Sequence, residues 1–100
     1  RVIERRAQRD GFYIVRNLGG HGVGRHIHEE PHVANHARGA DRFTLHEGLV
    51  LTIEPFLTMG PATALEGADG WTLRTSDGSI GAQFEHTFVV TGGPPLVLTH

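Results

Sequence analysis

The spacing of apolar and polar residues predicts one helix at the start of the chain. Residues 1–9 place three apolar side chains on one helical face and leave the arginines and Glu4 on the solvent side. The residues of the apolar face are Val2, Ile3 and Ala7. We expect the helix to end at Asp10 and Gly11, because glycine readily adopts the positive φ with which many helices stop.

Short strands separated by turns are predicted for the rest of the chain. Apolar or β-branched runs predict strands at residues 12–15, 49–53, 71–75, 81–90 and 96–98. Glycine, proline and other turn formers predict loops or turns at residues 17–24, 60–70, 76–79 and 91–95. The pattern therefore predicts one α+β unit, mostly antiparallel sheet with a helix at its start.

Composition narrows the class of protein. A hydrophobic fraction of 38% and a charged fraction of 20% are typical of a folded globular chain. The net charge is −2 with scattered basic residues, which does not indicate a nucleic-acid partner or a membrane surface. No apolar run approaches the roughly 18 residues of a membrane span. The absence of cysteine excludes disulfides and thiolate metal sites and favours the cytoplasm.

Three positions carry side chains that can bind a metal ion. His21 lies between glycines, whose lack of a side chain lets the main chain approach an ion or a substrate. Glu54 ends an apolar strand directly before Pro55, where a buried carboxylate needs a cation or hydrogen-bond donors. Glu85 lies within the predicted strand 81–90, on the face away from the phenylalanines.

Each of these positions also has a purely structural interpretation. His21 can be incidental to a glycine-rich turn, Glu54 can point to water at a strand end, and Glu85 can be exposed on a half-buried strand. His86 shares its face with phenylalanines, so we expect a hydrogen-bonded core histidine there. If the three residues converge, one imidazole and two carboxylates suit Mn, Fe, Co or Zn. Spacing alone does not decide between these interpretations.

Four motifs occur in order along nearly the whole chain. They are His21-Gly22-Val23-Gly24-Arg25 with His28-Glu29-Glu30-Pro31, then Gly48-Leu49-Val50 through Glu54-Pro55, then Asp69-Gly70-Trp71-Thr72, and last Gln83-Phe84-Glu85-His86-Thr87. This series resembles the second half of type I methionine aminopeptidases. The resemblance implies half of a pita-bread (creatinase/aminopeptidase) fold, with residues 1–100 as the C-terminal part of a metallopeptidase catalytic domain. Because the chain also starts at Arg1 rather than at a methionine, we expect that its N-terminal half is absent.

The resemblance implies a site with two divalent ions, which can be Co, Mn, Fe or Zn. His21, Glu54 and Glu85 correspond to three of the family's five metal ligands, with Glu85 bridging the ions. The other two ligands are aspartates of the first half, so we expect three aspartates of this chain to be turn residues instead. These are Asp41, Asp69 and Asp77. The histidines expected at surface or loop positions are His32, His36 and His46.

The same resemblance implies catalytic and substrate-binding roles. Glu54 would also act as general base, and His28 would contact the substrate and stabilise the tetrahedral intermediate. Trp71 and Ile27 would line the pocket for the methionine side chain, although Ile27 stands where many relatives have phenylalanine.

The implied reaction is removal of the N-terminal methionine from nascent proteins. The complete enzyme is expected to be a cytoplasmic monomer that acts near the ribosome and binds neither nucleic acid nor membrane. The isolated chain is expected to be inactive or nearly so, because three ligands instead of five would bind metal weakly. Two alternatives stay open: a relative of the prolidase or aminopeptidase P type that cleaves Xaa-Pro bonds, and a non-enzymatic binding module with the pita-bread fold.

Overall fold

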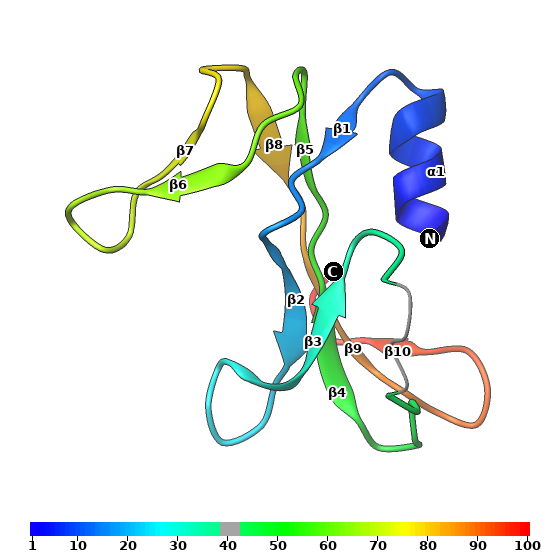
Figure 1. The fold of residues 1–100 in the computed structure, drawn as a ribbon. Coiled ribbons are helices and arrows are strands. Elements are labelled where there is room, and N and C mark those ends of the chain that lie inside the picture. The colour runs from blue at the N-terminus through cyan, green and yellow to red at the C-terminus, as the bar shows by residue number, and fades with distance from the viewer. Residues whose placement is uncertain (39–42) are drawn as a thin grey trace.

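The structure is a computed structural model and describes residues 1–38 and 43–100 (Figure 1). Its helix is α1 (Val2–Arg9). The strands are β1 (Tyr13–Ile14), β2 (Gly19–Gly22), β3 (Glu29–Ala34), β4 (Val50–Ile53), β5 (Phe56–Thr58), β6 (Ala64–Glu66), β7 (Leu73–Thr75), β8 (Gly81–Gln83), β9 (His86–Val89) and β10 (Leu96–Val97). They form three antiparallel sheets in the orders β1-β5-β8, β10-β9-β4-β2-β3 and β6-β7. The predicted α+β class, mostly antiparallel with a flanking helix, is confirmed.

Helix α1 occupies the predicted segment and ends as predicted. Asp10 follows its last turn, and Gly11 has a φ of 83°. Ala7 is buried, whereas Val2 is 82% exposed. The prediction of Val2 as part of a packed apolar face is therefore wrong, since this first residue of the helix lies at its open end.

Contrary to the prediction, the Glu4 side chain does not face solvent. Its carboxylate accepts a hydrogen bond from the Arg16 guanidinium at 2.7 Å and another from the backbone N–H of Ala37 at 3.0 Å. The hydrogen bond from Ala37 and the charge of Arg16 hold the pKa of Glu4 below its usual range, against the effect of burial. Glu4 thus joins the helix to two other segments, which a helical pattern cannot indicate.

The glycine-rich segment 17–24 contains strand β2 instead of the predicted loop. β2 lies in the five-stranded sheet between β3 and β4. A Cβ atom on Gly20 would overlap the carbonyl oxygen of Thr52, and one on Gly22 would overlap that of Glu30. These glycines therefore permit a close approach of strands rather than a turn. Strand β3 has no predicted counterpart, because its first half is polar and shows no alternation.

The predicted strand 81–90 is two strands, β8 and β9, which belong to different sheets. The partner segment is interrupted in the same way, since β4 ends before Glu54 and β5 begins after Pro55. β4 pairs with β9 and β5 pairs with β8, and the register is the same on both sides of the interruption. The register therefore sets Glu54 opposite Glu85. Pro55 has no N–H to donate to the ladder, which accounts for the loss of pairing at this point.

This interrupted pair of segments, β4–β5 with β8–β9, connects the two larger sheets. Figure 1 shows it running lengthwise through the molecule, β4–β5 in green and β8–β9 in orange. The buried apolar residues are Ala7, Val15, Leu51 and Ala62, and the buried polar residues are Asn35, Thr52, Glu54 and Thr58. Three of these polar residues belong to β4–β5, and one of them, Glu54, lies where strand pairing stops.

The remaining strand predictions hold with shorter bounds. β1, β4, β7 and β10 lie within segments predicted as strands, and residues 76–79 and 91–95 contain turns or bends as predicted. The predicted surface loop 60–70 is wrong in part, because it contains β6, which pairs with β7 as a hairpin. Among the described residues, no helix is long and apolar enough to cross a membrane.

Candidate metal centre

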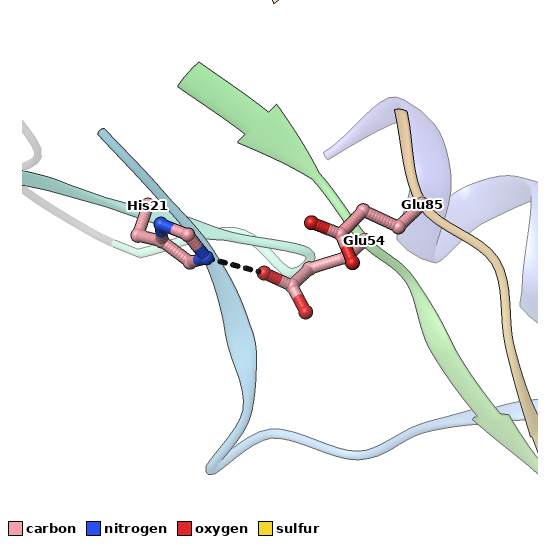
Figure 2. Close-up of side chains that lie close together, drawn as sticks. All are labelled: His21, Glu54 and Glu85. Atoms are coloured by element: carbon pink, nitrogen blue, oxygen red, sulfur yellow. Dashed lines mark ion pairs between the residues drawn. The ribbon is translucent and has the colours of Figure 1, made fainter. Parts of the chain in front are cut away.

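Three side chains from separate segments meet at the strand interruption (Figure 2). His21 lies in β2, Glu54 follows β4, and Glu85 precedes β9. One nitrogen or oxygen atom from each residue lies within 4.8 Å of the corresponding atoms of the other two. The structure thus brings together the three residues that the sequence nominated as metal ligands, and their ligand role stays a prediction.

Hydrogen bonding orients the imidazole ring of His21. Its Nδ1 atom lies 2.9 Å from the carbonyl oxygen of Gly22. A carbonyl oxygen can only accept, so Nδ1 carries a proton and donates it there. The other ring nitrogen, Nε2, lies 3.2 Å from Glu54 Oε1. In the neutral ring Nε2 is an acceptor that faces a carboxylate oxygen, and such a pair needs a proton or a metal ion between its atoms.

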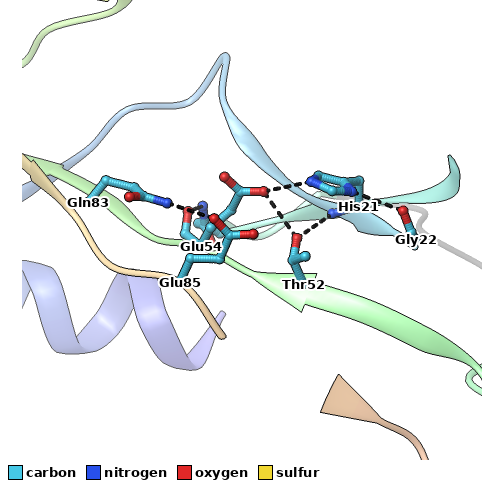
Figure 3. Close-up of polar contacts among 7 residues, drawn as sticks. His21, Gly22, Thr52, Glu54, Gln83 and Glu85 are labelled. Atoms are coloured by element: carbon cyan, nitrogen blue, oxygen red, sulfur yellow. Dashed lines mark hydrogen bonds and ion pairs between the residues drawn. The ribbon is translucent and has the colours of Figure 1, made fainter. Parts of the chain in front are cut away.

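Glu54 is the buried member of the cluster, with 8% exposure. The Thr52 hydroxyl donates to Glu54 Oε1 at 3.0 Å (Figure 3). The side-chain N–H of Asn35 donates to the Glu54 backbone oxygen at 2.9 Å. Within residues 1–38 and 43–100, the arginine ion pairs go to other acids, Asp10 and Glu4. A buried carboxylate without a cationic side chain beside it is a suitable place for a metal ion.

Glu85 is exposed and lies at the interruption between β8 and β9, not mid-strand as predicted. The side-chain N–H of Gln83 donates to Glu85 Oε2 at 3.2 Å (Figure 3). The predicted faces nevertheless continue through the interruption, since Glu85 pairs with Gln83 while the His86 ring lies beside those of Phe84 and Phe88. Glu85 therefore lies on the predicted side, away from the phenylalanines, where its carboxylate is close to Glu54.

The donor set fits a divalent ion of intermediate hardness. One imidazole nitrogen and two carboxylates suit Zn, Mn, Fe or Co, and three protein ligands leave further coordination positions open. His21 Nε2 and Glu54 Oε1 are two acceptor atoms only 3.2 Å apart, and a metal ion that both atoms bind would account for this approach. The structure therefore contains a candidate metal centre built from its own strand register.

His28 lies beside this centre, whereas the two predicted pocket residues, Ile27 and Trp71, are exposed. The His28 ring centroid is 4.2 Å from that of His21, with the planes tilted by 54°. Ile27 is 73% exposed, and Trp71, next to the turn of the β6–β7 hairpin, is 89% exposed. The described residues of this chain do not enclose either side chain, and the catalytic and substrate-binding roles of all three residues stay predictions.

The other histidines occupy several environments. His32 and His46 are exposed as predicted. His36 lies in a loop as predicted, but burial lowers its pKa, and its Nδ1 atom has no hydrogen-bond partner among the described residues. His86 is half-buried between the rings of Phe84 and Phe88. Its Nδ1 atom lies 3.2 Å from the Thr99 hydroxyl, so the predicted hydrogen bond is present although the ring is not fully in a core.

The aspartates that the structure describes contribute no ligand atom to this cluster. Asp69 and Asp77 lie in turns as predicted, and each accepts backbone hydrogen bonds from residues that follow it. Asp41 lies outside the described residues.

Three residues that hydrogen-bond to the candidate ligands were not predicted from the sequence, namely Thr52, Asn35 and Gln83. One signal existed for Thr52, because strand alternation places residues 52 and 54 on the same side of β4. The same signal existed for Gln83, which lies two residues before its partner Glu85. Asn35 acts across strands, and no local pattern indicates its partner.

Known proteins with similar sequences belong to one family. The sequence profile of metallopeptidase family M24 matches residues 1–92. The methionine aminopeptidase of Aquifex aeolicus (strain VF5) is 43% identical over 101 residues, covering 99% of this chain and 39% of that protein. Methionine aminopeptidase 2 of Bacillus subtilis (strain 168) is 40% identical over 100 residues, covering 99% and 40%. The chain spans about two fifths of the length of the curated relatives it matches.

Solved structures of similar proteins share the fold. The methionine aminopeptidase from Thermotoga maritima superposes with a TM-score of 0.87 at 38% identity, covering 96% of this chain and 39% of that chain. The enzyme from Rickettsia prowazekii gives a TM-score of 0.85 at 37% identity, covering 94% and 38%. The predicted resemblance and the predicted part of a pita-bread fold are confirmed.

Proposed function

Because the chain belongs to metallopeptidase family M24, we propose that His21, Glu54 and Glu85 are metal ligands of an aminopeptidase that removes N-terminal methionine. Membership of a metallopeptidase family implies the use of a divalent metal. Convergence carries the proposal, since three segments place one ligand atom each within 4.8 Å of one another. The specificity for methionine is supported by relatives that are methionine aminopeptidases and match 99% of the chain.

We assign residues 1–100 to the C-terminal part of a catalytic domain. The matched relatives extend well beyond the aligned segment, and three ligands leave coordination positions open. Two divalent ions, Co, Mn, Fe or Zn, would be bound together with carboxylates from outside this segment, and Glu85 would bridge them. Residues 1–100 alone would accordingly have little or no activity.

The residues of this chain would divide the catalytic work. When bound by these residues, divalent ions would supply Lewis acidity, which would activate water and polarise a peptide carbonyl. Glu54, the buried carboxylate of the cluster, takes the proton from the attacking water and passes it to the leaving amine. His28, beside His21, donates a hydrogen bond to the developing oxyanion, an interaction worth roughly 2.7–4 kcal/mol. Ile27 and Trp71 contact the methionine side chain.

The substrate class sets the cellular context. The substrates would be the N-termini of nascent proteins, which places the complete enzyme in the cytoplasm near the ribosome. We propose a monomer without a nucleic-acid or membrane partner.

Glu85→Gln tests the metal centre most directly. The change removes a charged ligand but keeps its size and its hydrogen-bond partner Gln83. Loss of a partner outside the ligand set already reduces metal affinity or activity by about 10–100-fold, so we expect a larger loss here. In the full-length polypeptide that carries this chain, hydrolysis of a Met-peptide with Mn or Co should fall more than about 100-fold. Bound metal, measured by elemental analysis, should fall with it.

Glu47→Gln is the matched control, because Glu47 is exposed and lies outside the cluster. It should keep both the activity and the metal content of the parent. Unchanged metal content in Glu85→Gln would refute the ligand role of Glu85. Preferred hydrolysis of Xaa-Pro peptides by the parent would favour the prolidase-type alternative, and a metal-binding parent without peptidase activity would favour a binding module.

A further inference from the structure

We propose that Thr52 is a positioning residue of the metal centre, whose buried hydroxyl holds the Glu54 carboxylate against His21. The inference rests on the proposed metal centre. Thr52 lies in β4 with 2% exposure, and its hydroxyl reaches both candidate ligands (Figure 3).

The direction of each hydrogen bond at Thr52 is fixed by chemistry. The backbone N–H of His21 lies 3.0 Å from Thr52 Oγ1, and an N–H can only donate. The hydroxyl proton is therefore free to point to Glu54 Oε1, also at 3.0 Å, where a carboxylate oxygen accepts it. The result is a chain from N–H to hydroxyl to carboxylate, in which each bond strengthens the next.

This chain of hydrogen bonds selects one position for the carboxylate. Glu54 Oε1 accepts from Thr52 and also lies 3.2 Å from His21 Nε2. The ring of His21 thus faces Glu54 Oε1 directly, and the backbone of His21 is linked to the same oxygen atom through the Thr52 hydroxyl. A threonine two residues before Glu54 can do this because side chains at residues 52 and 54 lie on the same side of a strand.

The close approach of β2 is what brings His21 within reach of Thr52. A Cβ atom on Gly20 would lie 3.0 Å from Thr52 Oγ1 and would overlap the carbonyl oxygen of Thr52. A side chain at this position would therefore push β2 away from the hydroxyl.

Thr58 shows what a buried threonine does without this role. It lies in β5 with the same 2% exposure, but its hydroxyl donates to the backbone oxygen of Gly60 at 2.7 Å. Its hydrogen bond serves the turn that follows β5. Thr58 is therefore a matched control for the loss of a buried threonine hydroxyl in the same segment.

The test compares Thr52→Val, Thr52→Ser and Thr58→Val in the full-length polypeptide. Removal of a residue that orients metal ligands reduces metal affinity by about 10–100-fold, which we expect for the Co(II) dissociation constant of Thr52→Val. Thr52→Ser keeps the hydroxyl and should stay within about threefold of the parent, as should Thr58→Val. The visible spectrum of bound Co(II) should change in Thr52→Val alone, because it reports ligand geometry. In the metal-free protein, the His21 amide should exchange its hydrogen faster in Thr52→Val than in Thr52→Ser.

Each other outcome has a definite meaning. Co(II) binding by Thr52→Val within about threefold of the parent, with an unchanged spectrum, would overturn the positioning role and leave the proposed function intact. A parent that binds no Co(II) would overturn the proposed function and this inference with it. Equal loss in Thr52→Val and Thr52→Ser would also overturn the inference, because the hydroxyl would not be the cause. If Thr52→Val does not fold, Thr52→Ala removes the same hydroxyl without a branched replacement and decides the question.

Discussion

The candidate metal centre and the β6–β7 hairpin place their proposed functional side chains in two different ways. At the centre, His21 and Glu54 each form a hydrogen bond with the Thr52 hydroxyl, and their side chains are only 14% and 11% exposed. Next to the hairpin turn, Trp71 is 89% exposed. The hairpin projects from the other two sheets in Figure 1, and Asn17 holds its base through two hydrogen bonds to the backbone of Ala64.

The two regions differ in how far this chain orders their side chains by itself. The candidate ligands are set by strand register, because Glu54 and Glu85 lie opposite each other in one antiparallel pair. The exposed aromatic side chain beside the hairpin turn has no such constraint from its neighbours. We therefore expect substitutions at the centre to change folding and metal binding together, and substitutions at the hairpin to change substrate preference alone.

Gly20→Ala should have the largest effect, because it acts on the strand spacing that forms the centre. The new Cβ would overlap the Thr52 carbonyl oxygen, so β2 must move. Overpacking of this kind costs about 1–3 kcal/mol in the free energy of unfolding, and Co(II) binding should be lost with it. Chemical denaturation and metal titration would measure both.

Gly93→Ala is the control for Gly20→Ala, since a Cβ atom there meets nothing within 4 Å. Its free energy of unfolding should change by less than about 0.5 kcal/mol. If Gly20→Ala proved as stable as Gly93→Ala and bound metal equally well, close packing of β2 could not be the basis of the centre.

Local patterns in the sequence predicted what depends on neighbours along the chain. The end of α1 at Asp10 and Gly11 and the strand before Glu54 follow from residues within a few positions. The identity of His21, Glu54 and Glu85 as a set came from the order of motifs, not from spacing. Even so, the order of the motifs does not indicate how close the three side chains lie.

The failures have one physical cause, which is pairing between segments far apart in the sequence. The loop predicted in place of β2 is wrong because glycines favour turns but also permit strands to approach closely. The glycines of β2 have this second role, since they lie between β3 and β4. The interruption at Glu85 was missed because it reflects Pro55 on the opposite segment, which no pattern within residues 81–90 reveals. The partners of Glu4 were missed for the same reason.

Trp71→Ala should affect substrate preference without a loss of stability. An exposed side chain contributes little to folding, so the free energy of unfolding should change by less than about 0.5 kcal/mol. If Trp71 contacts the methionine side chain, kcat/KM for a Met-peptide should fall at least about 10-fold, since apolar pocket contacts of even one methylene are worth about 1–3 kcal/mol. Metal content should stay at the parent level.

Ile80→Ala is the control for Trp71→Ala, because Ile80 is also apolar and 80% exposed but lies outside the hairpin. Its kcat/KM should match the parent. Equal losses of kcat/KM in the two variants would mean that Trp71 has no specific contact with substrate. The methionine side chain would then have to be bound by residues other than Trp71.

Lowering the pH should loosen the hairpin turn, and this effect should be smaller than those of Gly20→Ala and Trp71→Ala. The hydroxyl and backbone N–H of Thr72, with the backbone N–H of Trp71, donate to Asp69 and lower its pKa from 3.8 to about 2. A carboxyl whose pKa is lower in the folded state stabilises that state fully above its unfolded pKa of 3.8, and the contribution is lost as pH falls toward about 2. Hydrogen exchange of the Trp71 amide, followed by NMR, should therefore lose protection across this interval. Asp69→Asn keeps an acceptor oxygen but cannot titrate, so its protection should show no such step, and a step of equal size in that variant would assign the change to unfolding elsewhere.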